Sequence, residues 1–284
     1  MSRQVSLFAA LMLSLLLVGC GMFGGVTPTP TPWVVIVTAT PGGPGPQPEM
    51  SGDPIPADLL TGPCDHLLWP LRDGAVWRYS MTRGSEVREV SLSSAILPEG
   101  LVMRFDNQAS LLTCLEGAVA GLPPSPLSGH PDLGAGLTGS NPVGDFLADA
   151  SLLTPFGTAQ TWDEELTPGG TVRLPSLDQG AALNVTGGKI VLVSTSAPLE
   201  SITVPAGTYN TLPIDQQGFY DLRVNLPDGQ EASVLIALTQ RLYLAEGIGP
   251  VRIVFNGGTI STQGGTFELP GGITLELVDA ALPR

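Results

Sequence analysis

The chain has 284 residues, with 36 Gly and 27 Pro but only 13% charged and 6% aromatic side chains. Acidic residues outnumber basic ones 26 to 12, which gives a net charge of −14. Proteins that bind nucleic acids by neutralising phosphates need a basic face, so this class is excluded. Helical bundles and coiled coils are excluded as well, because Gly and Pro interrupt the chain throughout.

Residues 1–19 have the organisation of a secretory signal peptide. Arg3 precedes an apolar segment, residues 5–18, that is shorter than the about 20 residues needed to span a bilayer. The following Leu17-Val18-Gly19-Cys20 (LVGC) resembles the bacterial lipobox. This resemblance implies cleavage before Cys20 and attachment of a diacylglycerol to its thiol, with acyl chains such as palmitate as the membrane anchor. The alternative is an ordinary secretory signal with an incidental cysteine. We expect an extracytoplasmic chain, lipid-anchored to the cell membrane, and leave open which membrane.

Residues 20–63 are rich in Pro, Thr and Gly, with TPTPTP at 27–32 and PGGPGPQP at 41–48. Such segments favour extended, polyproline-like geometry, so we predict a tether. Trp33–Val37 (WVVIV) is an apolar patch within it. It is either a short strand that docks on the domain or a contact with the envelope. We favour docking, because an exposed β-prone segment promotes aggregation.

From Cys64 to Arg284 the sequence predicts one all-β domain. Apolar and polar residues alternate in the segments 75–81, 87–97 and 101–105. We predict a hairpin of 181–186 and 189–196 around Gly187-Gly188, and a second of 221–226 and 231–238 around the turn 226–230. Further turn signals lie at 256–258, 263–265 and 270–272. The expected architecture is a single curved antiparallel sheet, a half-barrel or a sandwich.

Residues 117–180 interrupt this pattern, and we predict a long Gly/Pro-rich loop inserted in the domain. Asn141 as N-cap and Pro142 at the first helical position favour one short helix there. Phe146 and Leu147 would lie on its apolar face, and Pro155 would end it.

Cys64 and Cys114 remain once Cys20 is lipidated, and an even number of cysteines in an oxidising compartment favours a disulfide. Closing this loop would stabilise the fold by about 4 kcal/mol. The alternative is a Cys64–His66 nucleophile pair, which we disfavour because close neighbours on an extended chain point apart. His66 and His130 are the only histidines and no zinc-type spacing is present, so we expect neither a metal site nor a cofactor.

Asp163-Glu164-Glu165, next to Trp162, is the densest acidic cluster. It is either a solvated loop face, which we favour, or part of a sugar or Ca²⁺ site. Paired carboxylates from distant strands would suit a glycosidase, but the sequence identifies no pair. We therefore assign no catalytic residue.

Three stretches occur in the order 70–79 (P-x-x-x-G-x-x-W-x-Y), 204–209 (V-P-A-G-x-[FY]) and 243–251 (Y-x-A-x-G-[VI]-G-x-V). Together they resemble a group of secreted bacterial lipoproteins and periplasmic β-proteins, mostly of unknown function. The resemblance implies an extracytoplasmic β-domain and brings no catalytic residues. Within it, Trp77 and Tyr79 are expected in the core.

A curved sheet with a covering loop is similar to the half-barrels of LolA-like and LppX-like carriers. In such a fold the segments 234–238, 242–244 and 251–255 would line an apolar cavity. We expect a non-catalytic module that binds an apolar small molecule or an envelope protein, attached to the membrane through Cys20, and no nucleic-acid partner. The alternatives are a structural, envelope-organising lipoprotein and, less favoured, a secreted hydrolase that uses paired carboxylates.

Overall fold

The structure is a computed structural model that describes residues 50–106, 108–115, 117–124, 136–153, 158–174 and 182–284. These residues belong to one compact unit, Gln47–Arg284, which we call the β-domain. Cys20, Trp33–Val37, His130 and Pro155 lie outside the described residues.

The described part of the β-domain consists of strands and a single 3-10 helix, η1 (Ala57–Leu59). The strands are β1 (Met50–Ser51), β2 (Asp65–His66), β3 (Trp69–Pro70), β4 (Val76–Arg83), β5 (Glu86–Leu97), β6 (Gly100–Phe105), β7 (Gln108–Leu115), β8 (Ala118–Ala120), β9 (Gly136–Gly144), β10 (Thr161–Arg173), β11 (Ala182–Ser196), β12 (Glu200–Val204), β13 (Gly207–Asn225), β14 (Glu231–Ala245), β15 (Gly249–Thr262), β16 (Gly265–Leu269) and β17 (Ile273–Pro283). The predicted all-β class is confirmed.

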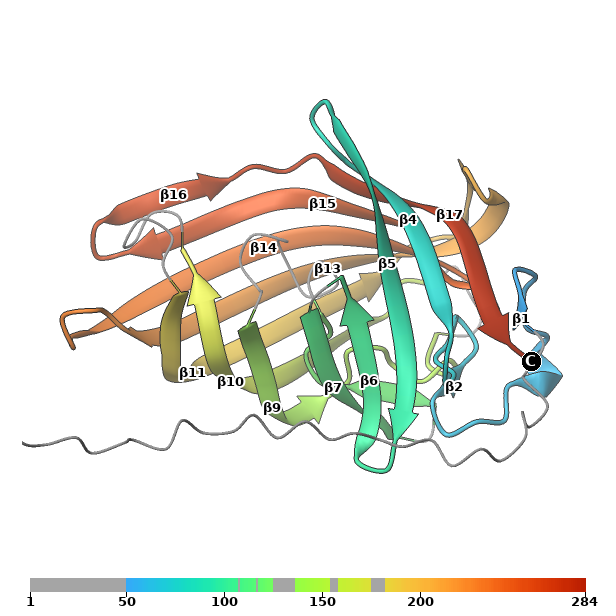
Figure 1. Ribbon diagram of the computed structural model, residues 1–284, viewed down its shortest axis with the longest axis horizontal. Coiled ribbons are helices and arrows are strands. Elements are labelled where there is room, and N and C mark those ends of the chain that lie inside the picture. The colour runs from blue at the N-terminus through green and yellow to red at the C-terminus, as the bar shows by residue number, and fades with distance from the viewer. Residues whose placement is uncertain (1–49, 107, 116, 125–135, 154–157, 175–181) are drawn as a thin grey trace, which may run out of the picture. The chain divides into compact units, whose positions relative to one another are not determined.

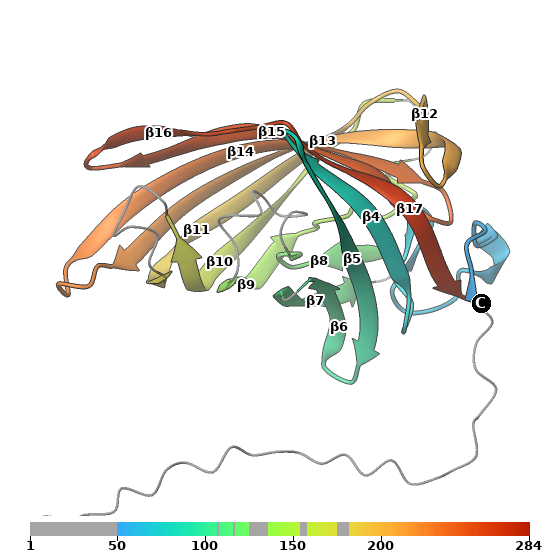
Figure 2. The ribbon, with the colours of Figure 1, turned by 45° about the horizontal axis from the view of Figure 1, so that its top comes forward.

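Fifteen of these strands form one antiparallel sheet, in the order β8-β7-β6-β5-β4-β17-β15-β14-β13-β11-β10-β9. The sheet curves over itself, so that its two end strands, β8 and β9, come close to each other (Figures 1 and 2). The result is a nearly closed barrel. β1, β12 and β16 are short additions that pair with β17, β13 and β15.

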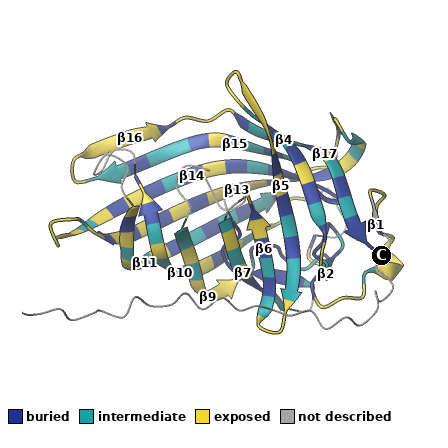
Figure 3. Cartoon of the chain, in the orientation of Figure 1, coloured by how far each residue is buried: buried dark blue, intermediate teal, exposed yellow. Residues whose placement is uncertain are grey.

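Side chains alternate between an inner and an outer face along each long strand. On β13, every second residue from Ile214 to Val224 is buried and its neighbours are exposed, which Figure 3 shows as alternating bands. The inner faces of all long strands contribute to one hydrophobic core. The period of two therefore fixes which face of each strand points inward.

Trp77 and Tyr79 are fully buried, as predicted. The Trp77 Nε1–H donates to the carbonyl oxygen of Ile248 at 2.6 Å, and the Tyr79 hydroxyl donates to that of Pro250 at 2.7 Å. The first and third sequence motifs are thus joined across the core, because the polar ends of two buried aromatic side chains need partners.

Three predicted glycine turns are wrong. Gly187 and Gly188 lie inside the continuous strand β11, at a bulge, and a Cβ on Gly188 would lie 1.9 Å from the Asp221 carbonyl oxygen. Gly257 and Gly258 lie inside β15, where the sheet divides: β15 pairs with β17 up to Phe255 and with β16 from Gly258. Glycine serves close backbone approach at these positions rather than chain reversal. The third, at 270–272, does not reverse the chain, because β16 and β17 pair with successive parts of β15 in the same direction. The predicted turns at 226–230 and 263–265 are confirmed.

The predicted long loop with a short helix is also wrong. Residues 117–180 contribute β8, β9 and β10 to the sheet. Asn141 has a φ of 52°, which is unlike an N-cap, and Val143 pairs with Glu165 within β9 and β10. Phe146, Leu147 and Ala148 are buried consecutively, without helical spacing. Pro142 is tolerated because β9 ends the sheet.

The end of the predicted tether packs on the β-domain. Met50 pairs with Pro283 at the end of β17, and Ile55 is buried. The Ile55 amide donates to the Gly247 carbonyl oxygen at 2.9 Å. The described fold therefore begins before Cys64, where the sequence placed the domain boundary.

Candidate functional site

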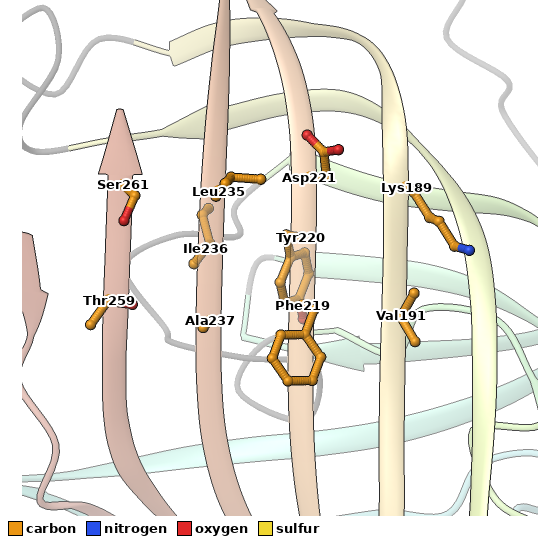
Figure 4. Close-up of a pocket in the computed structure, with 10 residues that line it drawn as sticks. All are labelled: Lys189, Val191, Phe219, Tyr220, Asp221, Leu235, Ile236, Ala237, Thr259 and Ser261. Atoms are coloured by element: carbon orange, nitrogen blue, oxygen red, sulfur yellow. The ribbon is translucent and has the colours of Figure 1, made fainter. Parts of the chain in front are cut away.

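A groove crosses the outer face of four neighbouring strands, β11, β13, β14 and β15 (Figure 4). We call it the outer groove; its volume is about 310 Å³. Its lining residues are Lys189, Val191, Phe219, Tyr220, Asp221, Leu235, Ile236, Ala237, Thr259 and Ser261.

Strand register arranges the outward side chains of the outer groove in two rows. One row runs Lys189, Asp221, Leu235 and Ser261; the next runs Val191, Phe219, Ala237 and Thr259. Directly opposed residues on neighbouring strands have adjacent side chains. The antiparallel ladder therefore brings residues from four strands into one surface.

The outer groove combines an apolar body with a polar margin. Phe219 and Leu235 are 46% and 54% exposed, although both are large and apolar. Lys189 and Asp221 lie at the polar margin, and the Lys189 Nζ also pairs with Glu165 Oε2 at 2.6 Å. This arrangement is suited to binding a group with an apolar body, because contact with it would remove Phe219 and Leu235 from water.

A second hollow, of about 330 Å³, lies beside η1 and includes Asp65, Arg72 and Arg284. The Arg72 guanidinium is held by Asp65, with its Nη2 2.9 Å from Asp65 Oδ2, and its Nη1 donates to the Pro283 carbonyl oxygen at 3.0 Å. These bonds tie the start of the domain to its C-terminal strand. Asp65, the more buried partner of the Arg72–Asp65 ion pair in this hollow, therefore has a structural role.

Cys64 and Cys114 form the predicted disulfide, with an S–S distance of 2.00 Å and a Cα–Cα distance of 5.1 Å. The His66 Nδ1 accepts a hydrogen bond from the Leu68 amide at 3.0 Å, and its Nε2 lies 2.9 Å from the Ala148 carbonyl oxygen. This pattern requires a neutral ring with the proton on Nε2. Burial lowers the pKa of His66, against a smaller raising effect from Ala148 and Asp149. The alternative of a Cys64–His66 nucleophile pair is therefore wrong.

The acidic cluster 163–165 is not the solvated loop face that we favoured. It lies in β10, where Asp163 and Glu165 point outward and Glu164 is fully buried. Glu164 Oε1 accepts a hydrogen bond from the Gly121 amide. The available sequence signal was the period of two that Glu164 shares with Leu166, both of them buried.

The pKa of Glu164 is raised to about 8, mainly by burial; the Gly121 hydrogen bond opposes this shift and the nearby Asp145 adds to it. The pKa of Asp145 is also raised, by burial and then by Asp149. Two carboxyls with raised pKa values are a feature of some hydrolases. However, Glu164 has no exposed surface in the described structure, so a substrate has no access to it.

The segments predicted to line a cavity contribute their inward side chains to the core. Val234, Ile253 and Phe255 are each at most 1% exposed and pack in one cluster. A buried polar row crosses this core: Gln240 Nε2 donates to Gln216 Oε1 at 2.6 Å, and Gln216 Nε2 donates to Ser194 Oγ at 3.2 Å. Within the described residues, these strands thus present packed side chains inward and the outer groove outward.

Among the residues that the structure describes, no group of three or more His, Cys, Asp or Glu side chains is arranged to hold a metal ion. The same residues contain no helix that is long and apolar enough to cross a membrane.

Fold and site together define an all-β, disulfide-bonded domain with a nearly closed antiparallel barrel and a groove on its outer face. No protein-family model matches the chain, and no curated protein matches it. Among solved structures, it is similar to a protein assigned as exported, with a YmcC-like fold, from Bacteroides fragilis NCTC 9343. That comparison has a TM-score of 0.39 and 12% identity and covers 76% of this chain and 99% of the other. A protein assigned as a lipoprotein from Parabacteroides distasonis ATCC 8503 has a TM-score of 0.31 and 12% identity, over 76% and 98% of the two chains.

Proposed function

We propose that this protein is an extracytoplasmic lipoprotein, anchored to the membrane through Cys20, whose β-domain is a non-catalytic module that binds an apolar ligand in the outer groove. The lipobox-like LVGC after an apolar segment supports the anchor. The outer groove supports the binding function. The two parts of the proposal are independent and have separate tests.

The observation that carries the binding function is the exposure of Phe219 and Leu235, diagonal neighbours on β13 and β14, in one hollow of about 310 Å³. The fold does not require apolar residues at these positions, because the hydrophobic core lies on the other face of the same strands. Small-molecule sites occupy roughly 300–1,000 Å³, so the outer groove suits a small ligand. Asp221, Lys189 and Ser261 at its margin favour a ligand with a polar end.

A fluorescence titration of residues 21–284 with the apolar probe N-phenyl-1-naphthylamine tests the binding function. We expect saturable enhancement with the wild-type chain and an affinity about tenfold lower for Phe219→Ser, because that variant removes the largest apolar side chain of the outer groove. Val143→Ser is the matched control, because Val143 is 70% exposed but lies on β9, outside the groove. Equal affinity of wild type and Phe219→Ser, or no saturable binding, would contradict the proposal.

The lipid anchor is tested by metabolic labelling of the full-length chain with an alkyne-bearing palmitate analogue. We expect the wild type to be labelled and Cys20→Ser to remain unlabelled, since the thiol is the attachment atom. Met22→Ser serves as a control for a change next to the cleavage site. Equal labelling of wild type and Cys20→Ser would overturn the assignment of Cys20.

A further inference from the structure

The barrel closes along a seam, which we define as residues 118–122 together with the facing parts of β9, β10 and residues 145–148. Val119 and Leu147 exchange two backbone hydrogen bonds of 3.0 Å. Gly139 lies so close to Leu122 that a Cβ would be 2.9 Å from the Leu122 Cβ. Among the described residues, the seam thus forms few backbone hydrogen bonds, in contrast to the fifteen in-register residue pairs between β13 and β14.

A further bond across the seam comes from a buried side chain. Glu164 Oε1 accepts from the Gly121 amide and so links β10 to the opposite side of the seam. Its second oxygen, Oε2, is buried and has no hydrogen-bond partner among the described residues. A neutral carboxyl tolerates such a position far better than a carboxylate, because a buried charge without a counter-charge is costly.

The elements packed against Glu164 do not offset a negative charge. Its pairing partners are Leu192 on β11 and Gly144 on β9, and the next residue after Gly144 is the acidic Asp145. Asp149 follows on the same segment and interacts with His66 rather than with Glu164. The flanking Asp163 and Glu165 point to the outer face, where Glu165 pairs with Lys189.

We propose that the neutral carboxyl of Glu164 is a latch that holds the seam of the barrel closed, and that loss of its proton to solvent at alkaline pH opens the seam. The raised pKa of Glu164, about 8 against 4.5 in an unfolded chain, agrees with this geometry. Because the folded state holds the proton more tightly, the contribution of Glu164 to stability is full below about pH 4.5 and is lost as the pH rises through 8. The negative charge of Asp145 repels the carboxylate that Glu164 becomes when it loses its proton.

Hydrogen–deuterium exchange of residues 21–284 at pH 6 and pH 9, corrected for intrinsic exchange rates, tests the latch. At pH 9, one unit above the pKa of Glu164, we expect peptides that contain residues 117–124 to lose about tenfold in protection. Peptides from residues 214–224 of β13 should keep their protection, since the central ladder does not depend on Glu164. Unchanged protection of the seam at pH 9, or an equal loss in β13, would overturn the proposal.

Two variants separate the latch from a general effect of alkaline pH. Glu164→Gln keeps an acceptor for the Gly121 amide but cannot ionise, so its seam should remain protected at pH 9. Glu165→Gln removes the neighbouring outward carboxyl and should lose seam protection as the wild type does. If Glu164→Gln does not fold, a titration of the Glu164 carboxyl by ¹³C NMR in the wild type replaces it: an ordinary pKa near 4.5 would refute the latch.

Discussion

Both faces of β11, β13 and β14 carry large apolar side chains, but those on the inner face are buried and those on the outer face are partly exposed to solvent. On β13, Leu222 is fully buried in the core, whereas Phe219 is 46% exposed on the opposite face. The apolar side chains on the inner face are explained by folding, because their burial stabilises the barrel. Exposure on the outer face contributes little to folding, and the two rows of the outer groove place Phe219 and Leu235 on neighbouring strands. The comparison therefore separates side chains that maintain the fold from those available for a ligand.

The largest expected effect on the stability of the buried face comes from removing the Cys64–Cys114 disulfide. Cys64→Ala/Cys114→Ala removes a crosslink between residues 50 positions apart. We expect the free energy of unfolding to fall by about 4 kcal/mol, because the unfolded chain regains the entropy of an open loop. Urea denaturation of the variant and of the wild type, each with and without reductant, measures the change. If reductant lowers the wild type and the double variant equally, the disulfide is not the cause.

A truncation on the inner face should be the next largest effect. Leu222→Ala leaves a cavity among packed side chains in the middle of β13, and we expect a loss of about 3 kcal/mol in the free energy of unfolding. Folded Leu222→Ala should bind N-phenyl-1-naphthylamine with nearly the wild-type affinity, since Leu222 does not line the outer groove. A loss of less than about 0.5 kcal/mol would show that the inner face is not tightly packed there.

Acid should lower the free energy of unfolding of the β-domain through the buried His66. Because burial lowers the pKa of His66 in the folded state, the unfolded chain binds the proton more readily. Stability is therefore full above pH 6.5 and falls as the pH decreases below that value. Protonation also removes Nδ1 as the acceptor for the Leu68 amide. We expect His66→Gln to flatten the pH dependence of the free energy of unfolding below pH 6.5, measured by urea denaturation; an unchanged slope would assign the effect to other groups.

The smallest expected effect on stability is on the outer face. Phe219→Ser should lower the free energy of unfolding by only about 1 kcal/mol, because the side chain stays 46% exposed in the folded state and so buries only part of its apolar surface. Thermal and urea denaturation of Phe219→Ser beside Leu222→Ala measures the contrast directly. A loss comparable to that of Leu222→Ala would mean that Phe219 serves the fold, and the separation of the two faces would be wrong.

Local patterns predicted the parts of the fold that depend on local physics. Alternation located β4, β5 and β6, and the Leu226–Gln230 turn located the hairpin of β13 and β14. The glycines at 187–188 misled, because the reason for them is the Asp221 backbone on another strand. Residues 117–180 misled in the same way, since β8 and β9 become strands by pairing with β7 and β10 at the two ends of the sheet, which local sequence does not show.

The disulfide could be predicted because compartment and cysteine count determine it without the fold. The outer groove could not, because its residues come from four strands whose mutual register a single sequence does not state. Glu164 illustrates an intermediate case. The sequence shows that Glu164 and Leu166 are two residues apart, the spacing that places residues on one face of a strand. Predicting that Glu164 is buried also required recognising β10 as a strand.

A methyl-resolved NMR titration of residues 21–284 with N-phenyl-1-naphthylamine tests the central claim most directly, because it reports which face of the sheet meets the ligand. The account predicts shift changes at Val191, Leu235 and Ala237, which line the outer groove, and none at Leu222, Val224 or Ile253 in the core. Shift changes concentrated at the core methyl groups would contradict it and would indicate that the ligand enters the barrel.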